Sequence, residues 1–357
     1  MTKDLTGGNP LKVILLFTLP LVLGNLFQQF YALADTIIVG RFCGVSALAS
    51  VGSTGSINYL ILGFVIGICN GFAIPIAQLF GARDYSDLRR HVANAAWLCI
   101  AFSVVLTITT VTLTRPLLVL MQTPEDILDG AVIYIGWIFA SIPFIFLYNM
   151  VASIMRALGD SKTPLYFLII CSILNIGLDI FCIKSLNMGV KGAAIATGIA
   201  QLISGVACLI YMVKKFPMLR LSRADMKLHL PTVKRLIGIG LPMGLQFSIT
   251  AIGSIILQKA VNNLGTDIIA GVSAASKVQT LVMSPMDAFG VSMATFSGQN
   301  YGARRLDRVR RATKEVTLML WAYSAIAFCI FFFGAKYMLE NRPASQPDVS
   351  VPPVSRP

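Results

Sequence analysis

The chain has 357 residues, of which 56% are hydrophobic and 13% are charged, and its mean hydropathy is +0.75. A soluble domain of this length could not remain in solution with so much apolar surface, so the composition excludes a soluble globular protein and predicts a polytopic membrane protein. The net charge of +13 does not predict nucleic-acid binding, because the lysines and arginines stand in short clusters between apolar runs.

Apolar segments long enough to cross the hydrocarbon core of a membrane recur along the chain. About nine helices of roughly 20 residues each are expected. They fall near 11–38, 52–80, 92–114, 128–156, 164–184, 192–213, 232–262, 268–300 and 315–339. The predicted fold class is therefore an all-α polytopic membrane protein.

The lysines and arginines predict the orientation of these helices. If the N-terminus is cytoplasmic, the inside connections carry most of the positive charge, at 83–90, at Arg156 and Lys162, at 214–235 and at 304–314. The outside connections carry little of it. This distribution predicts a multi-pass protein of the plasma membrane with a cytoplasmic N-terminus.

An internal repeat links two parts of the chain. The segment QLFGARDYSDLRR at 78–90 aligns with QNYGARRLDRVRR at 299–311, and the Leu-Pro pair at 19–20 reappears at 241–242. A repeat of six helices starts its second copy on the side of the membrane where the first began. The two copies should therefore be parallel, related by a pseudo-two-fold axis along the membrane normal, with a cleft between them.

The repeat predicts three regions. Residues 1–221 form a six-helix N-terminal lobe, and residues 222–340 form a partial C-terminal lobe of three helices. Residues 341–357 are proline-rich and polar, cannot span a membrane, and are expected to be a disordered, non-native tail. The second copy is then incomplete, and one alternative interpretation is a non-functional fragment of a disrupted reading frame.

A ladder of small residues, Gly63, Gly67 and Gly71, lies in the second predicted helix. This spacing lets a second helix approach closely. We interpret the ladder as helix packing and not as a binding site.

Four stretches of the chain together resemble the multidrug and toxic compound extrusion (MATE) transporters. They are the stretch from Pro20 through Gln28 and Asp35 to Gly40, IAQLFGAR at 76–83, the Asn-x3-Asp of the fifth helix at 175–179, and TFSGQNYGAR at 295–304. The resemblance covers about residues 8–340 and is strongest to the bacterial and archaeal branch whose cation site lies in the N-terminal lobe. Members of the family have twelve helices, so this chain departs from them after the ninth.

The resemblance implies a buried cation-binding cluster, which by motif and spacing consists of Asp35, Asp179, Asn175, Tyr134 and Thr197. Asn175 and Asp179 are four residues apart, which puts both side chains on one helix face. Two carboxylates in one apolar cavity lose hydration and repel each other. The pair is therefore expected to bind and release protons, or to hold a sodium ion together with the neighbouring oxygens. The alternative is that Asp35 caps a helix end near the outer interface and Asp179 is a solvated loop neighbour.

Four further residues are candidates for the substrate cleft, namely Gln28, Gln246, Met286 and Asp287. An intramembrane carboxylate such as Asp287 could contact a cationic substrate, or it could face water at a helix kink. Pro20, near the start of the first helix, is the candidate hinge.

The predicted function is secondary active export, in which inward H+ or Na+ drives the efflux of amphipathic, often cationic organic compounds. The expected partners of a monomeric chain are the lipid bilayer and a small organic substrate. We expect no nucleic acid, no ATPase subunit and no cofactor besides the coupling ion. No catalytic residue is predicted, and no metal site beyond one for sodium, so the chain is not expected to be an enzyme. The alternatives are a lipid or lipid-linked precursor flippase of the same superfamily and, from another class, an intramembrane enzyme.

Overall fold

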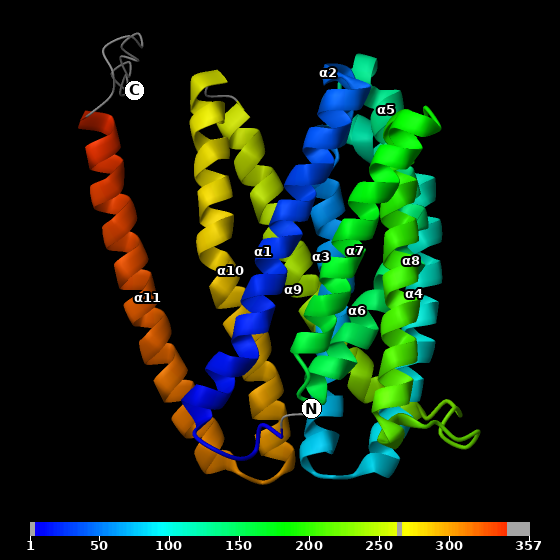
Figure 1. Cartoon of the computed structure of the whole chain (residues 1–357), viewed down its shortest axis with the longest axis vertical. Coiled ribbons are helices and arrows are strands. Elements are labelled where there is room, and N and C mark those ends of the chain that lie inside the picture. The colour runs from blue at the N-terminus through cyan, green and yellow to red at the C-terminus, as the bar shows by residue number, and fades with distance from the viewer. Residues whose placement is uncertain (1–3, 263–265, 341–357) are drawn as a thin grey trace. The chain divides into compact units, whose positions relative to one another are not determined.

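The computed structural model describes residues 4–262 and 266–340, and this part of the chain is helical and contains no β-strand. Figure 1 shows the helices in chain order, from α1 in blue to α11 in red. The α-helices are α1 (Pro10–Cys43), α2 (Val45–Ser53), α3 (Gly55–Gly81), α4 (Tyr85–Leu120), α5 (Glu125–Ala140), α6 (Ile142–Ala157), α7 (Lys162–Ile180), α8 (Gly189–Lys215), α9 (Leu230–Asn262), α10 (Thr266–Gly302) and α11 (Leu306–Glu340). A short π-helix, η1 (Phe181–Ser185), continues α7, and a 3-10 helix, η2 (Pro217–Leu219), follows α8. The predicted all-α fold class is confirmed.

The chain divides into two compact units after Arg311. The first unit holds α1 to α10 and the first residues of α11, and it contains every site described below. The remainder of α11 belongs to the second unit.

Among the described residues, seven helices are long and apolar enough to cross a membrane, namely α1, α3, α4, α7 with η1, α8, α9 and α11. Helices α5 and α6 make an eighth span if they are counted together, although they bend by 46° around Ser141. Pro143 has no backbone N–H to donate to the preceding turn, which explains why the predicted segment 128–156 is not one straight helix. The predicted segment 268–300 is helical as part of α10, but α10 does not meet the same test of length and apolarity.

Residues 45–53 form a separate helix that the hydropathy pattern does not predict. Helix α1 ends at Cys43, and Gly44 adopts a φ of 87°, a conformation that favours glycine. The chain turns there into α2, so α3 begins only at Gly55.

The glycine ladder of α3 brings α3 and α9 together at the distance of backbone contact. A Cβ atom on Gly67 would lie 2.6 Å from the carbonyl oxygen of Met243, and one on Gly71 would lie 2.5 Å from the Cα atom of Gly240. Only small residues allow helices to cross this closely. The interpretation of the ladder as helix packing is therefore confirmed.

The two copies of the repeated motif meet where α3 and α10 end. The backbone of Gly81 lies against the carbonyl group of Gln299, and the backbone of Gly302 lies against the carbonyl group of Gln78. The two contacts are equivalent, because exchanging the two copies of the motif turns one contact into the other. A two-fold relation between the copies requires this equivalence. Neither glycine has room for a side chain.

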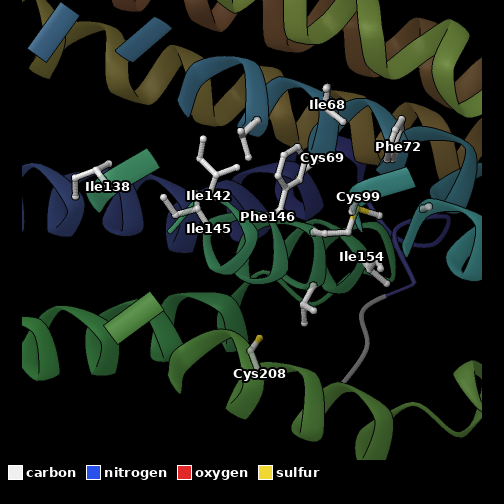
Figure 2. Packing of buried hydrophobic residues seen from close by; sticks show 14 of the residues in the cluster. Ile68, Cys69, Phe72, Cys99, Ile138, Ile142, Ile145, Phe146, Ile154 and Cys208 are labelled. Carbon is white, nitrogen blue, oxygen red and sulfur yellow. The ribbon is translucent and has the colours of Figure 1, made fainter. Parts of the chain in front are cut away.

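A continuous hydrophobic core lies mainly between α3, α4, α5, α6 and α8. Figure 2 shows part of this core, with side chains from these helices close together. The labelled residues are Ile68, Cys69 and Phe72 of α3, Cys99 of α4, Ile138 of α5, Ile142, Ile145, Phe146 and Ile154 of α6, and Cys208 of α8. Lipid is as apolar as these side chains, so close packing rather than escape from water holds such helices together.

The residues before α1 are bonded to the end of α10 and the start of α11. The backbone N–H of Leu5 donates to Gln299 Oε1 at 3.0 Å, and Nε2 of the same glutamine donates to the carbonyl group of Ala157 at 2.8 Å. The Arg308 guanidinium donates to backbone carbonyl groups of this first segment, at distances from 2.7 to 3.4 Å. The start of the chain is thus fastened to a side chain 294 positions later.

Candidate functional site

Asp35 of α1 and Asp179 of α7 meet inside the first unit. Asp179 is completely buried and Asp35 is 8% exposed. The two carboxyl groups interact electrostatically, and neither oxygen of Asp179 has a hydrogen-bond partner among the described residues. Asp35 lies about two turns before the end of α1 at Cys43, so it caps no helix end. The alternative interpretation of these two residues as a cap and a solvated loop neighbour is therefore wrong.

Three side chains from α5, α7 and α8 complete the polar surroundings of the carboxyl groups. The hydroxyl of Tyr134 donates to Asp35 Oδ2 at 3.5 Å. Asn175 Nδ2 donates to Thr197 Oγ1 at 3.2 Å, and this hydroxyl donates in turn to the carbonyl group of Ala193 at 3.1 Å. The structure thus brings all five residues of the predicted cation site together. We call this set the carboxylate cluster: Asp35, Tyr134, Asn175, Asp179 and Thr197.

Tyr31 also contacts the carboxylate cluster, although it is not among the site residues predicted from the sequence. Its hydroxyl lies 3.3 Å from Thr197 Oγ1, and either oxygen can be the donor. A signal for this contact is present in the sequence, since Tyr31 and Asp35 are four residues apart and share one face of α1.

Four oxygen atoms of the carboxylate cluster are buried without a hydrogen-bond partner among the described residues. They are Asp35 Oδ1, Asn175 Oδ1 and both carboxyl oxygens of Asp179. An unpaired buried polar atom costs about 1–3 kcal/mol, and a charged one costs more. Protonation removes the charge of a carboxylate and supplies a donor, whereas a hard cation such as Na+ takes oxygen ligands directly. The donor set therefore fits either H+ or Na+.

A separate cavity of about 320 Å³ lies between α3, α6, α9 and α10. We call it the inter-repeat cavity, because both copies of the repeat contribute walls. Its lining residues are Asn70, Ala73, Ile74, Ser153, Arg156, Met243, Gln246, Phe247, Met286, Asp287, Gly290, Val291, Ala294 and Thr295. Three of the four predicted cleft residues, Gln246, Met286 and Asp287, line this cavity, whereas Gln28 lies exposed on α1 outside the lining.

Arg156 differs from its predicted position. The positive-inside pattern places it in a cytoplasmic connection, but α6 continues to Ala157 and the Arg156 side chain lines the inter-repeat cavity. Its Nη2 donates to Ser153 Oγ at 2.7 Å and to Asn70 Oδ1 at 3.3 Å. The distribution of positive charge in the sequence predicts the end of the helix correctly, but it does not reveal that the Arg156 side chain points into the cavity.

Helix α1 continues through Pro20 without a break. Hydrogen bonds on either side of this proline join α1 to α10. Thr18 Oγ1 donates to Ser292 Oγ at 2.7 Å, and Asn25 Nδ2 donates to the carbonyl group of Ser284 at 3.3 Å. A bend at Pro20 would therefore disturb the contact between α1 and one wall of the inter-repeat cavity. The hinge itself stays a prediction.

Comparison with known protein families agrees with this architecture. The family model MatE matches residues 20–181 and 242–341, which together are more than half of the chain. The chain belongs to the MATE family. One MATE relative, the probable multidrug resistance protein YoeA of Bacillus subtilis (strain 168), is 29% identical over 306 residues, which are 84% of this chain and 66% of the relative. The chain thus spans about two thirds of the length of that relative.

Solved structures share the fold. A MOP superfamily transporter from Pyrococcus furiosus has a TM-score of 0.85 and 24% identity, covering 96% of this chain and 76% of that chain. A crystal structure of MATE in the bent conformation also has a TM-score of 0.85, with 25% identity, covering 95% of this chain and 77% of that chain. The described residues therefore have the multi-span helical fold of MATE transporters.

Proposed function

We propose that this MATE-family chain acts in the secondary active export of amphipathic organic compounds, driven by inward movement of H+ or Na+. The observation that carries the proposal is the carboxylate cluster, whose four unpartnered oxygens fit a proton or a sodium ion. The inter-repeat cavity is the proposed substrate site. The resemblance to a probable multidrug resistance protein supports organic compounds as the cargo.

Asp35 and Asp179 are the proposed cation ligands. Two ionised carboxylates side by side in a buried site repel each other, and no cation of the described residues lies within 4.0 Å of either to offset the repulsion. Binding one proton or one sodium ion removes that repulsion. The loaded and empty clusters therefore favour different arrangements of their helices, which is the energetic requirement for coupling an ion to a conformational change.

The proposed coupling runs through α1. Thr197 of α8 contacts Tyr31 of α1 at the carboxylate cluster, and the hydrogen bonds at Thr18 and Asn25 join α1 to α10. When a cation loads the cluster, α1 bends about Pro20 and its contact with α10 changes. The α10 wall of the inter-repeat cavity then moves and releases the organic compound.

The proposed setting is the plasma membrane, with the N-terminus in the cytoplasm. The clusters of lysine and arginine in the alternate connections support this orientation. We further propose that the transporter is a monomer, is not an enzyme, and needs no ATPase subunit and no cofactor besides the coupling ion.

Transport of a lipid or a lipid-linked precursor is the second candidate function. One observation favours it, since Arg156 gives the inter-repeat cavity a cation that a phosphate headgroup would bind well. The buried carboxyl pair favours cation-driven export, because a passive flippase has no use for a site that takes up H+ or Na+.

Efflux of a fluorescent cationic dye from energised cells tests the proposed function. We expect Asp35→Asn and Asp179→Asn each to reduce efflux to the level of cells without the transporter, because an amide cannot take up a proton and lacks the negative charge that attracts a cation. Glu125→Gln removes an exposed carboxylate as the matched control and should leave efflux unchanged. Full efflux by both cluster variants would refute the assignment.

Proteoliposomes separate the two possible coupling ions. An inward proton gradient in potassium buffer and an inward sodium gradient at uniform pH are applied in turn, and dye movement is followed. Transport under only one of these gradients identifies the ion, while transport under neither gradient, with the dye still bound, would argue against antiport.

A further inference from the structure

The inter-repeat cavity contains one cationic and one acidic side chain, Arg156 of α6 and Asp287 of α10. Among the described residues, no carboxylate lies within 4.0 Å of the Arg156 guanidinium, so the two groups line the same space without forming an ion pair. Asp287 likewise has no ion-pair partner there. The cavity therefore offers two separate charges of opposite sign.

The guanidinium of Arg156 is held in position by neutral groups only. Nη2 donates to Ser153 Oγ and Asn70 Oδ1, while the buried Nε atom has no hydrogen-bond partner among the described residues. A buried cation without an opposite charge is costly, and a planar guanidinium fits an acidic oxygen pair through two parallel hydrogen bonds. Arg156 is thus both oriented and incompletely satisfied.

The remaining walls of the cavity are largely apolar. Met243 and Phe247 of α9 and Met286 of α10 contribute flexible or aromatic side chains, which adapt to hydrophobic ligands of different shapes. The volume of about 320 Å³ is at the lower end of the range for small-molecule pockets. A ligand must therefore be compact, with an apolar body and charged groups at its ends.

We propose that the inter-repeat cavity selects amphipathic zwitterions, whose acidic group binds Arg156 and whose cationic nitrogen binds Asp287. This inference rests on the proposed function only in taking the cavity as the substrate site. A ligand that is purely cationic leaves the Arg156 charge without a neutralising partner. The arginine is therefore the residue that distinguishes a zwitterion from the cation of the same shape.

A matched pair of dyes tests this selection. One is a rhodamine that carries amino groups and a free carboxylate, and the other is its methyl ester, which has the same ring system but lacks the acidic group. Binding of both to the purified full chain in detergent is measured by fluorescence anisotropy, with empty micelles as the blank. We expect the free acid to bind more tightly, and equal affinities of the two dyes would overturn the proposal.

Substitution of the two charged residues should separate their roles. Arg156→Gln should weaken binding of the free acid by about 30-fold or more, since removing one partner of a buried charge pair usually costs this much affinity. The affinity for the ester should change by less than threefold. Asp287→Asn should weaken both dyes, because both carry the cationic nitrogen. Arg220→Gln removes an exposed positive charge from a loop and is the matched control, expected to change neither.

Arg156 also joins α6 to α3, so the stability of each variant must be measured with its affinity. Arg156→Lys keeps the charge without the planar fork and should retain part of the preference for the free acid. If Arg156→Gln lowers the melting temperature sharply, Arg156→Lys and Ser153→Ala carry the test instead. Equal losses for both dyes in Arg156→Lys would show that the arginine only holds helices together, and would overturn the proposal.

A zwitterionic headgroup of a phospholipid has the same chemistry as a free organic zwitterion. Competition with a short-chain phosphatidylethanolamine distinguishes these sources, because displacement of the free acid assigns the cavity to headgroups and lack of displacement assigns it to free compounds. Equilibrium binding requires no ion gradient. A cavity without dye preference would therefore refute selection while leaving the Asp35 and Asp179 efflux test of the proposed function intact.

Discussion

The carboxylate cluster and the inter-repeat cavity both place polar groups within a bundle of apolar helices, but they differ in enclosure and in charge. The cluster is tightly enclosed, with acidic groups at its centre and hydroxyl and amide groups around them. The cavity is larger, has apolar walls, and holds one charge of each sign. The first suits a small ion stripped of water, and the second suits an organic compound.

The difference also lies in which helices build each region. The cluster draws on α1, α5, α7 and α8, while the cavity draws on α3, α6, α9 and α10, so no side chain belongs to both. Changes in one region should therefore leave the equilibrium properties of the other largely intact. Transport, which needs both regions, should fail when either is altered.

The largest expected effect comes from the helix crossing that shapes the cavity. Gly71→Val would push a side chain into the backbone of α9, where an added Cβ atom lies 2.5 Å from the Cα atom of Gly240. We expect a destabilisation of about 3 kcal/mol, seen as a fall in melting temperature of roughly 6–12 °C. Dye binding in the cavity should weaken as well.

The matched control for this substitution is Gly238→Val, on the partner helix α9. An added Cβ atom at Gly238 meets no other atom within 4 Å. Its melting temperature should change by less than about 2 °C, since only helix propensity is altered. Equal shifts for the two variants would mean that α3 and α9 do not depend on the close crossing.

A substitution in the carboxylate cluster should raise the stability of the protein, whereas Gly71→Val lowers it. Asp179→Leu removes two buried oxygens that have no partner, so we expect a gain in stability of about 1–3 kcal/mol together with loss of transport. Thermal unfolding in detergent and dye efflux are measured on the same variant. A fall in melting temperature would indicate that Asp179 is satisfied in the resting protein.

Asp225, in the loop before α9, is the control for Asp179, because its carboxylate has hydrogen-bond partners. Hydrogen bonds from the backbone N–H and the hydroxyl of Ser222, together with Arg89, hold the pKa of Asp225 below its ordinary value. Its ionised form is therefore favoured by folding, and Asp225→Asn should lower stability slightly. The same reasoning predicts that this small contribution is lost as the pH falls through the lowered pKa.

A smaller effect is expected at the hydroxyl that joins the helices of the cluster. Thr197→Ala removes the acceptor for Asn175 and the contact with Tyr31. Losing hydrogen bonds worth about 1 kcal/mol should slow ion-driven efflux by about five- to tenfold. Thr197→Ser keeps the oxygen and should restore the rate, whereas equal activity of the alanine and serine variants would exclude a role for the hydroxyl.

The smallest expected effect distinguishes two glutamines that are both predicted from the sequence to line the substrate cleft. Gln246 lines the inter-repeat cavity, and Gln28 is exposed outside it. Gln246→Ala should change dye affinity by about two- to fivefold, the size expected for one modest polar contact, while Gln28→Ala should stay within the error of the measurement. The reverse order would place the substrate along α1 instead.

Local patterns were sufficient to predict most helices, and the resemblance to MATE transporters implied all five residues of the carboxylate cluster. Apolar runs show where helices lie, and the four-residue spacing of Asn175 and Asp179 puts them on one face. The break at Ser141 escaped prediction because Pro143 lies within a run that is apolar on both sides. Helix α2 escaped for a similar reason, since only the conformation of Gly44 separates it from α1.

Side-chain direction was the part that patterns could not supply. Arg156 reads as one more cation at the end of a helix, and only the positions of Asn70 and Ser153 show that it turns into the cavity. The same is true of Gln28, because its position in the α1 sequence does not show which neighbouring helix its side chain faces. Tyr31 could have been found by extending the four-residue rule from Asp35 back along α1.

The bonds between Leu5 and Gln299 also bear on how the protein is made. During synthesis the first residues leave the ribosome long before α10 exists, and at typical elongation rates the 294 residues between the two partners take roughly 15–60 s to add. Helix α1 must therefore enter the membrane with its preceding segment still unattached. The hydrogen bonds of that segment can form only after α10 has been synthesised, so fastening of the N-terminal residues is a late step of assembly that cannot precede the insertion of α10.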